Sequence, residues 1–215
     1  MTHLAVAQNA LASLIAGLAD NKLFLGRRYA EWCTAAPTLE SAVAAAAMAQ
    51  DEIGHARSFY PLLRDVAGES SETEPETRTA FTNAAFLDHS FEGWTDFVAA
   101  NFLFDTALSV LLEAATDSST NALGQRARRI LEEETLHWLH GEGWTRRLAG
   151  KGDAVRGRLM ESFGEVWPQA LAWFDVATDD LVADGTLACG AQTLRDRYAL
   201  RIGAAMDATE LPALG

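Results

Sequence analysis

The sequence is poor in cysteine and in basic residues, and each shortage excludes a class of protein. Cys33 and Cys189 are the cysteines in 215 residues, so they cannot form a disulfide framework, and they lack the spacing of a zinc site. We expect both to be reduced. Lysine and arginine together number 17 against 30 aspartates and glutamates, for a net charge of -13. Because binding to nucleic acid requires a basic face, this charge argues against that function.

Long apolar runs are also scarce. We identify no run of about eighteen apolar residues, free of charged residues and glycines, of the kind that spans a membrane. The N-terminal stretch MTHLAVAQNA has no basic flank leading into an apolar core, as a signal peptide would have. We therefore expect a soluble, cytoplasmic protein. Since 49% of the residues are hydrophobic and nothing marks a boundary, residues 1–215 are expected to form one globular domain.

The sequence does show helical periodicity, with almost no strand signal. Apolar residues recur at alternating steps of four and three from Leu11 to Trp32, which predicts a helix over residues 4–33. Thr38 is placed to cap a second helix that continues to Gly68. These two helices precede a shorter acidic stretch.

That stretch, residues 69–78, is polar and is expected to be a solvated connection. Pro61 should kink or break the last turns of the second helix. The remaining predicted helices cover residues 94–116, 119–148, 153–176 and 191–207. Four long helices followed by shorter ones predict an all-α fold, a four-helix bundle with additional C-terminal helices.

Two of the long helices carry a glutamate and a histidine three residues apart. Glu52 and His55 lie in AQDEIGHARSF, and Glu134 and His137 lie in LEEETLHWLHG. Residues three apart share one face of a helix, so each pair can project a carboxylate and an imidazole together. Two such pairs, with carboxylates from the other two helices, form the di-iron carboxylate pattern of helical bundles. The alternative for either pair is a salt pair on a solvated helix face.

Two further charged residues fall at inward positions. Asp105 interrupts the apolar run NFLFDTALSVLL, and a buried carboxylate requires a partner, which would be a metal ion or a salt bridge between helices. Lys22 lies between Leu18 and Leu25 in the apolar stripe of the first helix, which directs its ammonium inward. A protonated lysine cannot ligate a metal, but it neutralises carboxylates much as an ion does. The alternative is that Lys22 snorkels to solvent.

These segments resemble a known family. QDEIGH (residues 50–55), preceded by APTL (residues 36–39), resembles the catalytic A-type subunit of bacterial phenylacetyl-CoA epoxidase, a multicomponent di-iron monooxygenase of ferritin-like fold. LADNKLFLGRRYAEWC (residues 18–33) and FLFDTALSVLLEA (residues 102–114) are more similar to the structural C-type subunit of the same complex. The resemblance covers most of residues 10–175 and implies a ferritin-like bundle.

The resemblance also implies site residues. It places Glu52, His55, Asp105, Glu134 and His137 on metal-ligand positions of the catalytic subunit. It places Lys22 where that subunit has a glutamate ligand. Three arrangements follow: one metal with Lys22 in place of the second, two metals with Asp20 or a water supplying the missing ligand, or no metal and a cluster held by salt bridges.

Two functions from different classes are therefore considered. The first is an oxygenase with a di-iron or a single-metal site. In it the five residues on metal-ligand positions hold one or two ions of iron or manganese. These metals suit a mixture of carboxylate oxygen and imidazole ligands. By resemblance its substrate would be an aryl- or acyl-CoA thioester. Because the sequence contains no nucleotide or flavin motif, electrons would come from a separate reductase. Lys22 would serve as a catalytic proton donor if burial lowered its pKa, although the adjacent carboxylates act in the opposite direction. The second is a non-catalytic structural subunit. In both cases we expect an oligomer, homomeric or with related bundle subunits.

Charge is uneven along the chain. Residues 126–158 contain eight basic and five acidic residues, in contrast to the acidic remainder. This segment is suited to an acidic partner surface or an anionic ligand. The alternative is a solvated helix face with pairs such as Arg129 and Glu133.

Overall fold

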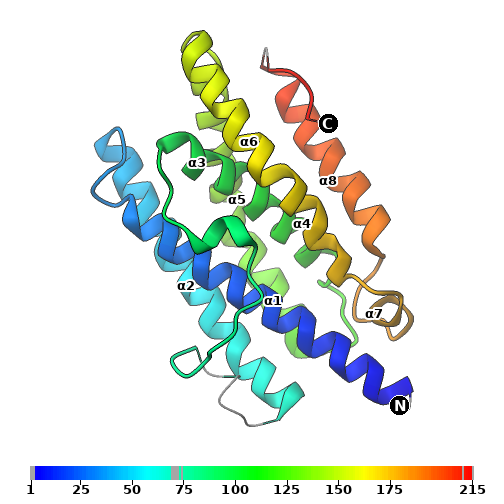
Figure 1. The fold of residues 1–215 in the computed structure, drawn as a ribbon. Helices are drawn as coiled ribbons and strands as arrows, with labels where there is room; N and C mark the ends of the chain where they lie inside the picture. Colours follow the sequence, from blue (N-terminus) through cyan, green and yellow to red (C-terminus); the bar gives the residue numbers. More distant parts are fainter. Residues whose placement is uncertain (1–2, 69–72, 74, 210, 215) are drawn as a thin grey trace.

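The computed structural model describes residues 3–68, 73, 75–209 and 211–214, and every regular element within these ranges is helical (Figure 1). The predicted all-α bundle is confirmed. The long helices are α1 (His3–Glu31), α2 (Leu39–Ala67), the α3–α4 segment (94–114) and α5 (Asn121–Ala149). The C-terminal helices are α6 (Asp153–Trp173), α7 (Asp179–Ala183) and α8 (Ala191–Met206). Helix α6 packs on the α3–α4 segment and α8 on α4, outside the bundle.

The ends of α2 follow from its sequence, but its proline does not break it. The Thr38 hydroxyl accepts a hydrogen bond from the Ser41 backbone N–H, as an N-cap does, and the helix ends at Gly68, whose φ is 85°. Pro61 lies inside the continuous helix, so the expected break is absent and the helix extends to Ala67. The cap and the C-terminal glycine were predicted correctly.

The third long segment departs from a regular α-helix before Asp105. It consists of α3 (Trp94–Ala99), a π-helical segment (Ala100–Asp105) and α4 (Thr106–Ala114). A π-helical turn has one more residue than an α-helical turn, and such turns occur frequently at functional sites. The periodicity of the sequence predicted one uninterrupted helix here, and that prediction was wrong in this detail.

Two glycines let the helices that carry the site approach closely. A Cβ at Gly26 of α1 would lie 2.7 Å from the Ile53 side chain and 3.1 Å from the Cβ of Glu52 on α2. A Cβ at Gly141 of α5 would lie 3.0 Å from the Cα of Phe102 in the π-helical segment. Larger side chains at these positions would push α1 from α2 and α5 from the π-helical segment. Both glycines therefore set the width of the bundle at the candidate site.

The end of the α2–α3 connection is anchored to the bundle. Asp20 of α1 is fully buried and accepts hydrogen bonds from the Tyr60 hydroxyl, the Arg78 guanidinium and the backbone N–H and hydroxyl of Thr82. The Arg78 side chain is only 7% exposed and Thr73 is buried, contrary to the expected solvation of residues 69–78, whereas Glu76 and Thr77 are exposed as expected. Residues 69–72 and 74 of the predicted stretch lie outside the described residues.

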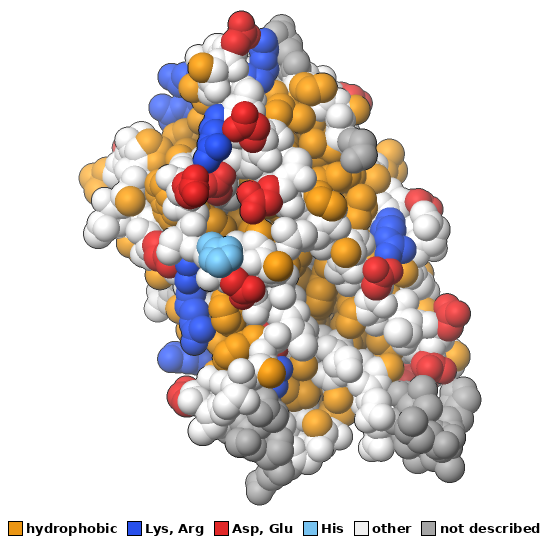
Figure 2. Space-filling model, viewed as in Figure 1, with side chains coloured by type: hydrophobic (Ala, Val, Ile, Leu, Met, Phe, Trp, Pro, Cys, Tyr) orange, Lys and Arg blue, Asp and Glu red, His pale blue; other side chains and the backbone are white. Residues whose placement is uncertain are grey.

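Among the described residues, one helical segment is long and apolar enough to span a membrane, although the sequence suggested none. It is Trp94–Ala114, and 94% of its most apolar window is buried within the protein. Burial of this kind is what the central helix of a bundle requires. On the face shown in Figure 2, acidic and basic side chains are interspersed with hydrophobic ones.

Candidate functional site

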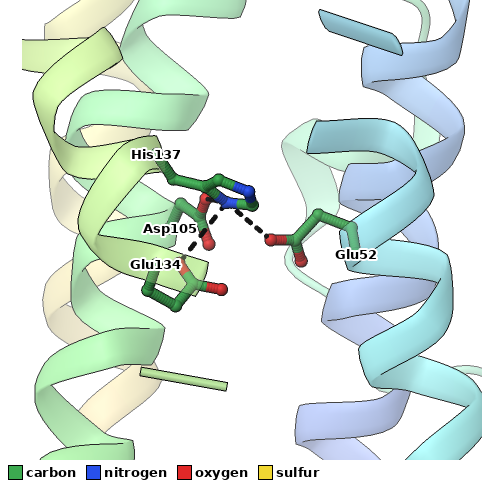
Figure 3. Close-up of side chains that lie close together, drawn as sticks. All are labelled: Glu52, Asp105, Glu134 and His137. Carbon is green, nitrogen blue, oxygen red and sulfur yellow. Dashed lines mark hydrogen bonds and ion pairs between the residues drawn. The ribbon is translucent and has the colours of Figure 1, made fainter. Parts of the chain in front are cut away.

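The six residues singled out in the sequence meet in the interior of the bundle. Each comes from a long segment: Lys22 from α1, Glu52 and His55 from α2, Asp105 from the end of the π-helical segment, and Glu134 and His137 from α5. All are buried. Figure 3 shows Glu52 extending from α2 toward Asp105, Glu134 and His137 on the opposite side of the bundle. We call these six residues the central cluster.

Lys22 lies at the centre of the three carboxylates. Its Nζ atom is 3.0 Å from Oε1 of Glu52, 2.6 Å from Oδ1 of Asp105 and 2.5 Å from Oε1 of Glu134. The Lys22 side chain is fully buried, so it does not snorkel to solvent. These are charge-assisted hydrogen bonds, and the three donors of one ammonium are matched by three carboxylates.

The two imidazoles each connect the carboxylates to the outer part of the bundle. Nδ1 of His137 is 3.2 Å from Oε1 of Glu52 and 3.1 Å from Oδ2 of Asp105. Nδ1 of His55 is 3.4 Å from Oε1 of Glu134. Both rings therefore direct Nδ1 toward the carboxylates and Nε2 away from them.

The groups that face Nε2 were not predicted from the sequence. Nε2 of His55 is 2.6 Å from Glu133, and Nε2 of His137 is 3.4 Å from Asp51; both carboxylates are about two-fifths exposed, at 40% and 39%. Asp51 immediately precedes Glu52, and Glu133 immediately precedes Glu134. This proximity to predicted ligands is the feature of the sequence that could have indicated them. The hydroxyl of Ser109, also not predicted, donates to Oε2 of Glu134.

The charges of the cluster depend on one another. Burial lowers the pKa of Lys22, but Asp105, Glu134 and Glu52 outweigh it and raise that pKa well above its usual value, so the amine is an ammonium. Burial raises the pKa of Glu134, but the opposite effect of Lys22 and His137 is larger. The net result is a carboxylate with a pKa well below its usual range. Lys22 and Glu134 thus form a buried ion pair.

The pKa values of Glu52 and the two histidines are raised, whereas that of Glu134 is lowered. Burial, reinforced by Asp105 and opposed by Lys22, raises the pKa of Glu52 to about 7. Burial lowers the pKa of His137, but Glu134 and hydrogen bonds to Asp105 and Asp51 raise it well above its usual value. The pKa of His55 is also raised, because Glu134 and Glu52 outweigh its burial. The imidazoles therefore act with Lys22 as cations that balance the carboxylates.

Comparison with known proteins places this chain in a family. The family model described as phenylacetic acid catabolic protein matches residues 2–213. This chain belongs to that family. A similar protein is the C-type subunit of 1,2-phenylacetyl-CoA epoxidase from Escherichia coli (strain K12), which is 26% identical over 207 residues, covering 94% of this chain and 84% of the relative. The predicted membership is confirmed, and this relative is of the C type rather than the A type.

This chain has a donor set that could hold a metal ion. One ligand atom from each of Glu52, Asp105, Glu134 and His137 lies within 4.8 Å of the others, and all four residues are buried. However, the oxygens of the three carboxylates that would face an ion already contact the Lys22 ammonium. A metal–oxygen bond is about 2.0–2.2 Å long, so an ion at this centre would lie against Nζ, where two cations repel. With Lys22 protonated, the cluster does not fit a divalent metal.

Asp20 does not supply a substitute ligand. Its oxygens are bound by Tyr60, Arg78 and Thr82, away from the carboxylates that hold Lys22. To act as the sixth ligand of a two-metal site, Asp20 would have to give up these hydrogen bonds.

A cavity reaches the cluster from the side of α5 and α8. It has a volume of about 290 Å³ and its wall includes Asp105, Glu134 and His137. Trp138 also lines it, and the ion pair between Arg201 and Glu113, at 2.7 Å, forms another part of its wall. The chain therefore retains space beside the cluster for water or a small molecule.

Proposed function

We propose that this protein is a non-catalytic structural subunit of a phenylacetyl-CoA-epoxidase-type complex, in which the Lys22 ammonium takes the place of metal ions in the bundle. The observation that carries the proposal is the contact of one Nζ atom with Glu52, Asp105 and Glu134, at 3.0, 2.6 and 2.5 Å. A buried carboxylate cluster requires cations, and here a side chain supplies them without an exchangeable ion. The likeness to a C-type subunit supports the same role.

A second candidate is a metal-binding oxygenase subunit that acts on aryl- or acyl-CoA thioesters. It is favoured by the four donor atoms within 4.8 Å of one another and by the adjoining cavity. In that case Glu52, His55, Asp105, Glu134 and His137 would hold iron or manganese, which would supply dioxygen activation. For an ion to bind there, Lys22 would have to lose its proton or move away.

The surface of α2 and α5 supports association with another subunit. In the described part of the chain, four of the five exposed large hydrophobic residues lie on these neighbouring helices: Leu39, Val43, Leu136 and Leu139. Exposed apolar residues that share a face are typical of interaction surfaces. Gly54 of α2 and Gly143 of α5 have open space where a Cβ would be, which lets a partner helix approach closely.

The experiment is co-purification together with metal analysis. The chain is produced with an A-type subunit of the same family in medium supplemented with iron and manganese. We expect a stable complex in which metal is associated with the A-type subunit, and far less than one ion per chain in this protein purified alone. A full equivalent of metal in the isolated protein would refute the structural role.

A pair of matched variants tests the surface. Leu136→Asp on α5 should abolish the complex, whereas Leu200→Asp on α8, where the leucine is 76% exposed compared with 69% for Leu136, should leave it intact. Equal behaviour of the two variants would exclude the α2–α5 surface as the interface.

A further inference from the structure

We infer that this chain keeps a binding site for one divalent first-row transition-metal ion that is closed by the Lys22 ammonium alone, and that removal of this ammonium opens the site. The inference rests on the proposed function, in which the native protein is metal-free. It adds that Lys22 is the residue that determines metal exclusion, while the other members of the central cluster remain arranged as ligands.

The first support is the convergence of unlike donors. Three carboxylates and one imidazole from three different segments place one ligand atom each within 4.8 Å of the others. A salt-bridge cluster needs only opposite charges near one another, whereas a metal needs several donors directed at one point. Oxygen ligands with imidazole suit iron(II), manganese(II) or cobalt(II).

The second support is that one buried oxygen of the cluster has no hydrogen-bond partner. It is Oε2 of Glu52, in a fully buried residue. Leaving such an atom without a partner is costly in the protein interior. The three protons of Lys22 already face one oxygen each of Glu52, Asp105 and Glu134. A metal ion, which has a larger number of coordination positions, could bind this oxygen as well.

The third support is the outer contacts of the imidazoles. Nε2 of His55 contacts Glu133 at 2.6 Å, and Nε2 of His137 is 3.4 Å from Asp51. In a neutral imidazole that donates its Nε2–H to an outer carboxylate, the Nδ1 lone pair faces the interior. Histidines that bind metals are held in this way. The ring of His137, which belongs to the set of four converging donors, therefore has the orientation of a metal ligand, although Lys22 occupies the centre.

The Nζ atom of Lys22 is therefore the group that blocks metal binding at the centre of the three carboxylates. Methionine at position 22 would fill most of the lysine volume but would end one atom short of Nζ, leaving the centre of the three carboxylates open and negative. The cavity lined by Asp105, Glu134 and His137 gives an ion a route to this centre. Lys22→Met should therefore create a site without changing any ligand.

The experiment measures metal binding with a readout independent of activity. The parent, Lys22→Met and Lys22→Met/Asp105→Asn are stripped with chelator, incubated with cobalt(II) or manganese(II), freed of unbound metal by gel filtration, and analysed for metal content. Lys151→Met, which alters an exposed lysine, is the control. We expect about one ion per chain in Lys22→Met, little in the double variant, and none in the parent or in Lys151→Met.

Thermal unfolding gives a second readout. A ligand present at 100 times its Kd stabilises by about 2.7 kcal/mol, which for a chain of this size corresponds to a rise in Tm of roughly 5–10 °C. We expect this rise for Lys22→Met with cobalt(II), and no rise for the parent.

The outcomes separate the two proposals. If the parent itself takes up one ion, the proposed function fails. If the parent is metal-free and Lys22→Met is folded by far-UV circular dichroism but binds no metal, the inference is overturned and the proposed function stands. If Lys22→Met is unfolded without metal, it is prepared again with cobalt(II) present: folding only with the ion supports the inference, and failure to fold in both conditions overturns it.

Discussion

Removing the Lys22 ammonium should be among the most destabilising single changes in this protein when metal is absent. Deleting one partner of a buried ion pair costs about 3–5 kcal/mol, because the other charge is left buried and unpaired. Here one ammonium serves Glu52, Asp105 and Glu134, all within 3.0 Å and all at most 4% exposed. We therefore expect Lys22→Met to lose about 4–5 kcal/mol of unfolding free energy in chelator-treated buffer at pH 8.

The loss should depend on pH in a defined direction. In the parent, Lys22 helps to hold the folded-state pKa of Glu134 below its usual value, so the stability from this carboxylate is present above about pH 4.5 and is lost as pH falls through the folded pKa. In Lys22→Met burial is no longer opposed by the ammonium, and the carboxylates can be accommodated by taking up protons. The variant should therefore be closer to the parent at pH 5.5 than at pH 8.

The measurement is urea unfolding at both pH values, followed by far-UV circular dichroism with chelator present. Lys151→Met is the matched control, because Lys151 is exposed, and it should stay within about 0.5 kcal/mol of the parent. If Lys22→Met at pH 8 also stayed within that margin, the ammonium could not be the counter-ion of three buried carboxylates.

Two further predictions concern single groups in the same region. Burial, with a contribution from His137, lowers the pKa of His140 to about 4, so the free energy of unfolding should fall by at most about 3 kcal/mol as pH drops from about 6.5 toward 4. In urea unfolding at pH 7 and pH 4.5, His140→Gln should lack this part of the pH dependence. An unchanged pH dependence in the variant would count against the shift. Amine-directed acetylation of the folded protein should modify Lys151 and leave Lys22 unmodified until urea is added, as read by mass spectrometry of peptides; rapid acetylation of Lys22 in the folded protein would contradict its burial.

The periodicity of a helix indicates which of its side chains face inward, and this predicted part of the central cluster. Lys22 falls in step with Leu18 and Leu25, and all three are fully buried. The Glu-x-x-His spacing likewise placed Glu52 with His55, although the metal role of these residues remains a prediction. For Glu134 and His137 the pattern left a solvated face open, and the family resemblance supplied the expectation that they belong to the site.

Features that depend on contacts between helices could not be predicted in this way. The π-helical segment that ends at Asp105 packs closely against α5 at Gly141, whose missing side chain admits Phe102 at close range. The contact of Asp51 with His137 joins α2 and α5, and the position of one helix along the other cannot be derived from the sequence pattern. Asp20, two residues from Lys22, binds Arg78 of the connection instead of joining the cluster.

The exchange of metal for lysine changes the role of the histidines as well as the central cation. A metal-bound imidazole must be neutral at the ligating nitrogen, whereas in this cluster Glu134 and Asp105 raise the pKa of His137 and favour its protonated form. One lysine carries less charge than a divalent ion, and the protonated imidazoles make up part of the difference. The same three carboxylates can thus be neutralised by metal with neutral histidines or by Lys22 with charged ones. It follows that opening the site in Lys22→Met should release protons as the ion binds, because the histidines must return to their neutral form.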